Sequence, residues 1–385
     1  MKTKLSLLVI VAWALSITAL PSVASASCSF ADIHFSSDFD SGRLDGCEQT
    51  ASNSYTLTLK PENTPINPSP WYAFQVTNQS ETAQTITITL LSDGAPARYQ
   101  PRISSDKQNW QPVPYEKDQQ QMQFQVTVTD TVYVAGGEII DTSFYPSWLA
   151  ELAPTALITL GESSQGRPIH ALEHRVDGSA DWLVIIGRQH PPEVTGALAL
   201  VHFSQLLFSD DTAMRVFRQR YNILLVPMVN PDGVAAGNWR HNANGVDLNR
   251  DWKRRSQAET QAVHAKLTAI TAAGGRIRLA LDFHSTWRDV FYTMTADYVT
   301  VSGEPLQQPQ LVNDWLTALA NELAMPIENK PSHNPNSGVF KQYIADQFGV
   351  HGVTYEVGDQ TDREHIKRSA EAALTTLIKQ LFPDN

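Results

Sequence analysis

The spacing of apolar residues changes once along this chain of 385 residues. Between about residues 50 and 140, apolar and polar residues alternate in short segments such as 84–91 (QTITITLL) and 122–129 (MQFQVTVT). From about residue 155, continuous apolar runs alternate with longer segments of helical periodicity. Short alternating segments rich in Thr, Val and aromatic residues are typical of antiparallel sandwiches, and strands that alternate with helices are typical of α/β sheets. The chain is therefore predicted to hold an antiparallel β-sandwich followed by an α/β domain.

The change of pattern sets the expected boundary between the two domains. Segment 142–154 is the predicted join, so that the sandwich covers residues 27–145 and the α/β domain covers residues 146–385. Buried strands are predicted at 181–187, 221–228, 277–283 and 352–357, and helices at 192–209, 256–273, 309–324 and 363–381.

The first 26 residues differ from the rest in composition. Lys2 and Lys4 precede an apolar stretch at 5–20, and Ala24 and Ala26 place small residues two positions apart. A basic start, an apolar core and an A-x-A site are typical of a secretory signal peptide cleaved before residue 27, and an uncleaved membrane anchor is the alternative. We therefore expect an exported protein, periplasmic or secreted, with no stable insertion in the membrane.

The net charge of the chain limits which kinds of partner are expected. The formal net charge is −11, and it becomes −13 after loss of two lysines with the leader. An acidic surface argues against nucleic acid or an anionic membrane as the main partner.

Cys28 and Cys47 are the two cysteines, and export predicts a disulfide between them. A lipid anchor on Cys28 is the rival interpretation, although the preceding residues match a lipoprotein signal poorly.

A histidine and a glutamate follow the first buried strand of the α/β half. His190 and Glu193 stand three apart in "HPPE", where a strand ends and a helix is expected to begin. Imidazole and carboxylate both bind zinc, and the two side chains can converge if the backbone bends between them. The similar pair His170 and Glu173 lies within a predicted strand, where residues three apart point to opposite faces. A metal site is therefore predicted at the first pair only.

Further polar groups follow the other predicted strands. A polar loop at 229–252 follows the second strand, His284 ends the third, and Glu356 ends the last. Polar groups at the carboxyl edge of an α/β sheet share one crevice. Their common position favours one functional site over four unrelated loop residues.

These motifs together resemble those of zinc metallocarboxypeptidases of the carboxypeptidase A superfamily. The resemblance rests on residue type, order and strand context in "HPPE", "NPDG", "NWR", "GVDLNR", "DFHS" and "YEVG". In the first half, "SPWYAFQVTN" (69–78) and "YQPRISSDKQNWQPVP" (99–114) resemble the sandwich that precedes the catalytic domain in cytosolic carboxypeptidases. The resemblance implies a mixed-sheet zinc carboxypeptidase domain that follows the sandwich in the sequence.

The resemblance also implies roles for individual residues. His190, Glu193 and His284 correspond to the ligands of one zinc ion per chain. Glu356 corresponds to the general base that takes a proton from water and returns it to the leaving amine, and Arg240 corresponds to the group that stabilises the developing oxyanion.

Substrate binding is implied in the same way. Asn249 and Arg250 correspond to the residues that hold the terminal carboxylate of the substrate, and Asp247 corresponds to the carboxylate that orients the first histidine ligand. The family often has a tyrosine about twenty residues before the catalytic glutamate, where this chain has none. His333 or Tyr343 is expected to take its place.

Lys341 stands where cytosolic carboxypeptidases have a basic residue that faces the departing side chain. A partly buried lysine attracts a carboxylate, which predicts a preference for acidic C-terminal residues. Two alternatives remain: Lys341 lies on the solvated face of an amphipathic helix, or a shift of one residue places Phe340 in the pocket and favours apolar residues.

We therefore expect an exported, zinc-dependent carboxypeptidase that acts on the C-terminus of a peptide or protein. One alternative is an amidase or deacylase on the same scaffold. Another is a binding protein whose α/β half is inert, although such a domain would be expected to have lost a ligand or the base. No nucleic acid is expected as a partner.

Overall fold

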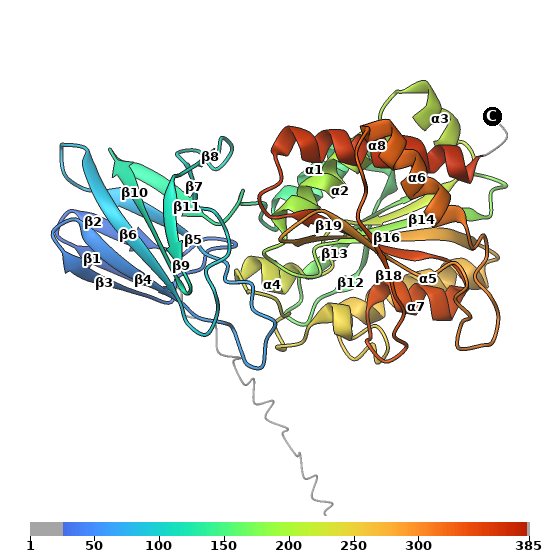
Figure 1. Ribbon diagram of the computed structural model, residues 1–385, viewed down its shortest axis with the longest axis horizontal. Coiled ribbons are helices and arrows are strands. Elements are labelled where there is room, and N and C mark those ends of the chain that lie inside the picture. The colour runs from blue at the N-terminus through green and yellow to red at the C-terminus, as the bar shows by residue number, and fades with distance from the viewer. Residues whose placement is uncertain (1–25, 383–385) are drawn as a thin grey trace, which may run out of the picture.

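The computed structural model describes residues 26–382. A part built of strands lies beside a larger part in which helices cover both faces of a sheet (Figure 1). This arrangement confirms the predicted fold class, a mixed-sheet α/β domain preceded by a β-sandwich.

The N-terminal part consists of two sheets packed face to face. The first sheet contains, in spatial order, β1 (Ser27–Phe30), β2 (Ile33–Ser36), β5 (Ala73–Asn78), β11 (Thr131–Ala135), β7 (Arg102–Ser104) and β8 (Gln111–Pro112). The second contains β3 (Gly46–Ala51), β4 (Ser54–Leu59), β6 (Gln84–Ser92), β10 (Gln121–Val128) and β9 (Tyr115–Asp118). Strand β10 alternates between exposed and buried residues along its whole length, because successive side chains of a strand point to opposite faces.

Aromatic side chains fill the space between the two sheets. The ring of Phe35 on β2 lies 5.1 Å from that of Tyr55 on β4 and 6.1 Å from that of Phe74 on β5. Cys28 on β1 and Cys47 on β3 form a disulfide that joins the two sheets at their edge. One pair departs from the expected antiparallel pattern, since β4 and β6 pair in parallel.

The α/β part is built on one sheet of eight strands. Their spatial order is β12 (Leu157–Glu162), β13 (Pro168–His174), β15 (Asn222–Val226), β14 (Asp181–Gly187), β16 (Arg276–Thr286), β19 (Gly352–Gly358), β17 (Val290–Thr293) and β18 (Asn329–Pro331). The four central strands β15, β14, β16 and β19 are mutually parallel. Their carboxyl ends therefore lie at one edge of the sheet, where ligands bind in open α/β sheets.

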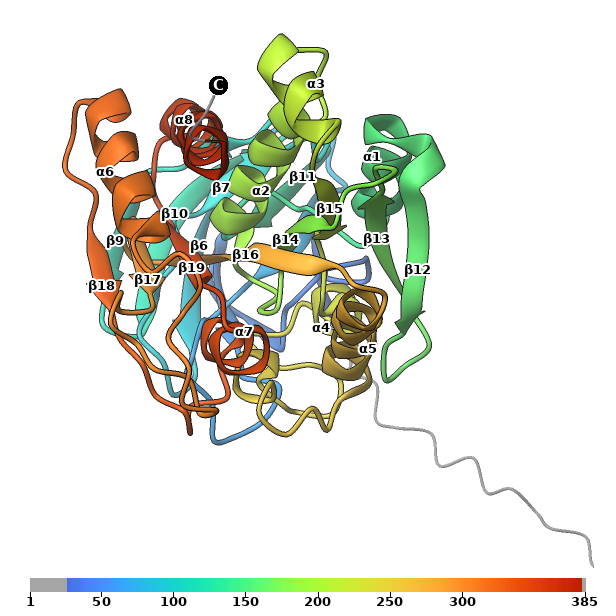
Figure 2. The same cartoon turned by 90° about the vertical axis from the view of Figure 1, so that its right-hand side faces the viewer.

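Helices cover both faces of this sheet (Figure 2). One face carries α2 (Val194–Leu207), α6 (Leu311–Leu323) and α8 (Arg363–Leu381), and the other carries α5 (Ala258–Ala272) and α7 (Phe340–Phe348). The remaining helices are α1 (Phe144–Leu152), α3 (Thr212–Arg218) and the short α4 (Pro231–Ala235). Within the described residues, no helix has the length and apolar character needed to cross a membrane.

The sandwich packs against the carboxyl edge of the α/β sheet. Arg98 of the sandwich makes a bidentate ion pair with Asp359, with nitrogen–oxygen distances of 2.7 and 3.0 Å. Glu138 accepts two hydrogen bonds of 2.8 Å from Arg363 at the start of α8. Paired guanidinium and carboxylate groups of this kind fix orientation as well as distance, so the two parts are held in a defined relative position.

Candidate metal centre and active site

A sharp bend after β14 brings the first two candidate ligands together. Arg188 adopts a positive φ of 54°, which is uncommon for a residue with a side chain. Its buried guanidinium stabilises the bend by donating to the carbonyl of Pro191 at 2.8 Å and to the hydroxyl of Tyr145 at 2.9 Å. The chain then enters α2 directly after Glu193.

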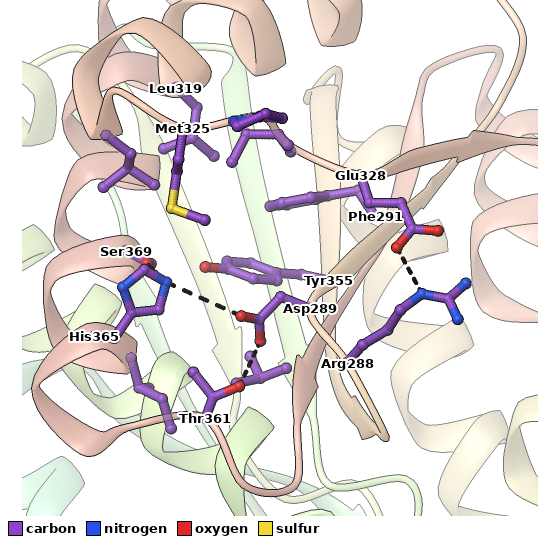
Figure 3. A pocket seen from close by; sticks show the side chains of 15 residues that line it. Arg288, Asp289, Phe291, Leu319, Met325, Glu328, Tyr355, Thr361, His365 and Ser369 are labelled. Carbon is purple, nitrogen blue, oxygen red and sulfur yellow. Dashed lines mark hydrogen bonds and ion pairs between the residues drawn. The ribbon is translucent and has the colours of Figure 1, made fainter.

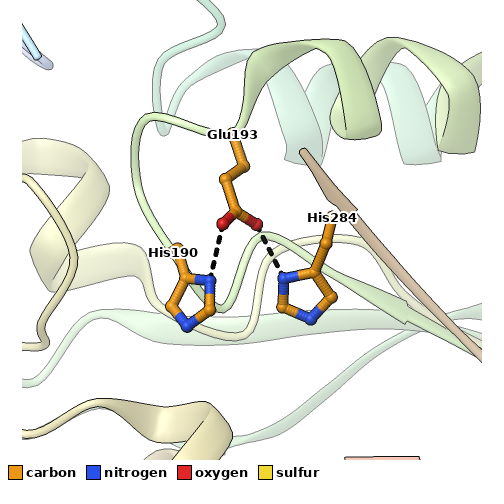
Figure 4. A group of neighbouring side chains, drawn as sticks. All are labelled: His190, Glu193 and His284. Atoms are coloured by element: carbon orange, nitrogen blue, oxygen red, sulfur yellow. Dashed lines mark hydrogen bonds and ion pairs between the residues drawn. The ribbon is translucent and has the colours of Figure 1, made fainter. Parts of the chain in front are cut away.

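Three buried side chains meet at this bend (Figure 4). Nδ1 of His190 lies 2.7 Å from Oε1 of Glu193, and Nδ1 of His284 lies 2.6 Å from Oε2 of the same carboxylate. One ligand atom from each residue falls within 4.8 Å of the other two. The sequence therefore identified residues that the fold brings together.

The third ligand is held by close packing between β16 and α2. A Cβ atom on Gly196 would lie 2.3 Å from the carbonyl oxygen of His284, so only glycine allows the helix to approach the strand this closely. The hydroxyl of Ser285 accepts a hydrogen bond of 2.8 Å from the backbone N–H of Gly196. The position of His284 is thus fixed relative to Glu193, three residues before that glycine.

A carboxylate lies against the far nitrogen of each histidine. Oδ1 of Asp247 is 3.0 Å from Nε2 of His190, as the family resemblance implied. Oδ2 of Asp282 is 2.7 Å from Nε2 of His284, a contact that sequence reasoning missed. The "DFH" motif contained the signal, because residues two apart on a strand point to the same face. Such carboxylates fix the tautomer of a metal-binding histidine.

This set of donors fits a zinc ion. Two imidazoles and one carboxylate, with a position left open, form a recognised catalytic zinc site. Burial opposes the charge on Glu193, but the adjacent His190 and His284 hold its pKa well below the usual value, so the ligand is ionised. His190 and His284 each present Nδ1 to the centre because Nε2 already has a carboxylate partner.

Glu356 lies beside the metal cluster on the next strand. It is the register partner of His284 in the parallel pair β16 and β19. Its Oε2 atom is buried and has no hydrogen-bond partner within residues 26–382. Burial raises the pKa of Glu356 to about 7, against the opposing effect of His284. A carboxylate that titrates near neutral pH suits a general base.

Arg240 is connected to the cluster through Asp247. Its Nε donates to Oδ2 of Asp247 at 2.7 Å, while the other oxygen of that carboxylate contacts His190. Burial alone would raise the pKa of Asp247, but His190 and Arg240 hold it well below its usual range. No group among the described residues bonds to the two terminal nitrogens of Arg240, which leaves them able to donate to a substrate.

The two residues expected to hold a terminal carboxylate have different environments. Asn249 is buried, and its amide contacts the backbone N–H of Phe340 at 2.9 Å and Nε2 of His284 at 3.3 Å. Arg250 is exposed, and its guanidinium donates one bond of 2.7 Å to the carbonyl of Asn249. Most of the donors of Arg250 are therefore free to bind an anion.

Lys341 does not lie on a solvated helix face. It is buried in α7, and Nζ donates to the carbonyls of Thr293, at 3.1 Å, and Ser332. No carboxylate pairs with this ammonium group in the part of the chain that the structure describes, and burial lowers its pKa to about 8. The alternative residue, Phe340, packs in the core against Trp252.

The two candidates for the missing tyrosine also differ. Tyr343 is buried, and its hydroxyl lies 2.8 Å from Nδ1 of His264 on α5, on the face of the sheet that α5 and α7 cover. The hydroxyl of Tyr343 therefore already has a partner within the protein. His333 is exposed and lines a hollow of about 450 Å³ with Tyr298, whose ring lies 5.1 Å away.

A separate pocket lies behind the strand that carries Glu356 (Figure 3). It has a volume of about 310 Å³, and its lining includes Phe291, Tyr355 and Ile366. Asp289 at its mouth accepts a hydrogen bond of 2.8 Å from Thr361. The lining contains none of the metal-binding residues, so this pocket is distinct from the candidate active site.

Family models match both parts of the chain. Residues 35–136 match the cytosolic carboxypeptidase N-terminal domain. Residues 145–376, more than half of the chain, match the zinc carboxypeptidase model. The chain belongs to the zinc carboxypeptidase family. Members of this family are hydrolases that depend on zinc, which agrees with the buried cluster of two histidines and a glutamate.

Individual relatives support this membership. An uncharacterised protein of Zymomonas mobilis is 29% identical over 228 residues, which cover 56% of this chain and 58% of the relative. Cytosolic carboxypeptidase 6 of Caenorhabditis elegans is 25% identical over 268 residues, 62% of this chain and 58% of the relative. A metallo-carboxypeptidase from Burkholderia cenocepacia shares the fold, with a TM-score of 0.78 and 20% identity over 92% of this chain and all of that one. The match thus spans little more than half the length of the first two relatives.

These relatives contradict the predicted export. The N-terminal family is that of cytosolic carboxypeptidases, and named relatives are cytosolic carboxypeptidases. They point to the cytosol, so the expectation of a periplasmic or secreted protein with a signal peptide is wrong. Residues 1–25 of the segment expected to be a signal peptide (1–26) lie outside the described part of the chain. Cys28 and Cys47 nevertheless form the expected disulfide.

Proposed function

We propose that this protein is a zinc-dependent metallocarboxypeptidase that hydrolyses the C-terminal peptide bond of peptides or protein tails. The observation that carries the proposal is the pairing of His284 with Glu356 in adjacent strands. This pairing places a metal ligand and a base with a pKa of about 7 side by side. One zinc ion per chain would be held by His190, Glu193 and His284, and would supply a Lewis acid for the scissile carbonyl.

The side chains around this centre have complementary tasks. Glu356 takes a proton from the attacking water and then delivers it to the leaving amine. Arg240 donates from its free terminal nitrogens to the oxygen on which negative charge develops. Asp247 holds Arg240 and His190 together, so the oxyanion donor and the metal ligand keep a fixed separation.

Recognition of the chain end is assigned to Arg250. Its exposed guanidinium suits bidentate pairing with a free carboxylate. Asn249 fixes the start of α7 through its bond to Phe340, and its amide contributes to the same carboxylate site. His333, in the hollow beside Tyr298, is proposed to contact the substrate in place of the missing tyrosine.

We further propose a preference for acidic C-terminal residues. The support is the buried ammonium group of Lys341, whose hydrogen-bond partners among the described residues are all neutral. Burying a charge without an opposite charge is costly, and a carboxylate on the departing residue would supply the missing partner. A glutamate, an aspartate or another amino acid with a second carboxylate would satisfy this site.

A panel of substrates tests the proposal. Purified zinc-loaded protein is incubated with peptides that differ only in the last residue, with the same peptides amidated at the C-terminus, and with N-acyl amino acids. Release of a single free C-terminal amino acid from the unblocked peptides is expected. Cleavage of the amidated peptides would exclude a carboxypeptidase, and cleavage of the N-acyl amino acids alone would favour the amidase or deacylase alternative.

A further inference from the structure

The carboxylate of Glu62 reaches out of the sandwich into the active-site loop. Its Oε2 accepts a hydrogen bond of 2.8 Å from the backbone N–H of Trp239. Its Oε1 accepts bonds of 2.9 and 2.7 Å from the N–H groups of Arg240 and His241. One charged side chain therefore satisfies three successive backbone donors, and hydrogen bonds to an ionised acceptor are about twice as strong as neutral ones.

Neighbouring sandwich residues hold the same loop from both sides. Nδ2 of Asn63 donates to the carbonyl of Gly245 at 3.2 Å, and its Oδ1 lies 2.7 Å from Nδ1 of His241. On the other side, the N–H of Ser41 donates to the carbonyl of Ala235 at 3.0 Å. The loop between α4 and the 3₁₀ turn η2 (Leu248–Arg250) is thus attached to the sandwich along most of its length.

Part of the loop borders a hollow, whereas Trp239 is fully buried in the hydrophobic core. A cavity of about 810 Å³ lies between the sandwich and the loop, and Glu62 and Asn63 line it together with Asn238 and Asn242. Burial fixes the side chain of Trp239, and the three hydrogen bonds to Glu62 fix the backbone N–H groups of residues 239–241.

The middle residue of this clamped segment is Arg240. Its side chain continues to Asp247 at 2.7 Å, and Asp247 contacts the metal ligand His190 at 3.0 Å. A continuous path of hydrogen bonds therefore connects Glu62, 178 residues earlier in the chain, to the catalytic centre.

We propose that Glu62 is a positioning residue for catalysis, which places the Arg240 guanidinium where negative charge develops in the transition state. This inference rests on the proposed hydrolytic function, because it assigns the sandwich a part in the same reaction. A small misplacement of a catalytic group by a distant change can reduce the rate by about 100-fold. Because Arg240 acts mainly on the transition state, the loss should appear in kcat and not in KM.

The catalytic test is a double-mutant cycle. Glu62→Gln replaces one acceptor oxygen with an NH2 group and removes the charge, and we expect kcat to fall about 10- to 100-fold with little change in KM. If Glu62 acts through Arg240, Glu62→Gln should cause no further loss in an Arg240→Ala background. Equal losses in both backgrounds would overturn the proposal. Glu62→Asp, which keeps the charge but shortens the side chain, serves as a second variant if the first folds poorly.

The positional test needs no activity. Hydrogen exchange followed by mass spectrometry should show faster exchange of the amides of residues 239–241 in Glu62→Gln than in the wild type. Glu116→Gln is the matched control, since Glu116 is exposed on β9 and makes no hydrogen bond to residues 239–241. Unchanged exchange at 239–241 would overturn the inference. A wild type that cleaves no peptide would instead count against the proposed function, and the exchange result would still decide whether Glu62 positions the loop.

Discussion

His284 and Glu356 are register partners on neighbouring parallel strands. Paired residues in adjacent strands direct their side chains to the same face, so the backbone hydrogen bonds of the sheet fix the base relative to a metal ligand. Sites built on strands hold their geometry better than sites on loops. Arg240, by contrast, stands on a loop and depends on contacts from another part of the protein.

Removal of a ligand should remove the metal. His284→Ala is expected to lose both zinc and activity, because two ligands hold zinc much less tightly than three. Zinc content by mass spectrometry of the purified protein, together with peptide cleavage, checks this. His170→Ala is the matched control, since His170 lies on β13 outside the cluster. Full zinc content in His284→Ala would remove this residue from the ligand set.

Removal of the base should spare the metal. Glu356→Gln is expected to keep its zinc and bind substrate, while kcat falls about 10²- to 10⁴-fold because the proton acceptor is lost. The alternative candidate for the base, Asp359, is ion-paired with Arg98, and Asp359→Asn should retain far more turnover. If the two variants behave in the reverse order, Asp359 is the base.

End recognition should depend on one guanidinium. In the wild type, amidation of the substrate C-terminus should abolish cleavage, and Arg250→Ala should lower kcat/KM for the free acid by about 10- to 100-fold, the value of a charged hydrogen bond. Arg254→Ala, which removes another exposed arginine of the same segment, should leave kcat/KM unchanged. Efficient cutting of an amidated peptide by the wild type would refute the carboxylate site.

The acidic preference should depend on pH through Lys341. Burial lowers the pKa of this lysine to about 8, and a lysine is charged below its pKa. For a pKa near 8, the charged fraction falls from about 0.9 at pH 7 to about 0.1 at pH 9. The ratio of kcat/KM for a peptide ending in Glu to that for one ending in Leu should therefore fall about tenfold as the pH rises from 7 to 9.

Two variants control this pH experiment. Lys341→Arg keeps its charge throughout the range, so the preference should persist at pH 9. Lys341→Met has no charge, and its ratio should be low at both pH values. A wild-type ratio that favours Leu at pH 7, or that does not change with pH, would show that Lys341 does not select the substrate.

The sequence predicted the regular elements where one local pattern dominates. The apolar run at 181–187 coincides with β14, and the expected helix at 363–381 coincides with α8. Short strands such as β1, β7 and β8 were missed, because two to four residues are too few to show an alternating pattern. Parallel pairing of β4 with β6 was also missed, since it depends on tertiary arrangement and not on local spacing.

The site residues that lie at or near the ends of buried strands could be predicted from the sequence. His190 follows β14, His284 lies near the carboxyl end of β16, and a bend at Arg188 brings His190 together with Glu193. Asp282 could have been found from its position two residues before His284. Glu62 could not, because its partners lie 177 to 179 residues away and are backbone groups, which carry no sequence signal.

The clamp formed by Glu62 also bears on the order in which the protein matures. A ribosome releases the sandwich before the loop at 239–241 exists, and domains made first generally fold first. The loop then emerges into the presence of a carboxylate already in place to receive it. The folded sandwich would then fix the conformation of the newly synthesised loop that carries Arg240. The conformation of the oxyanion site would depend on the sandwich and not on the catalytic part alone.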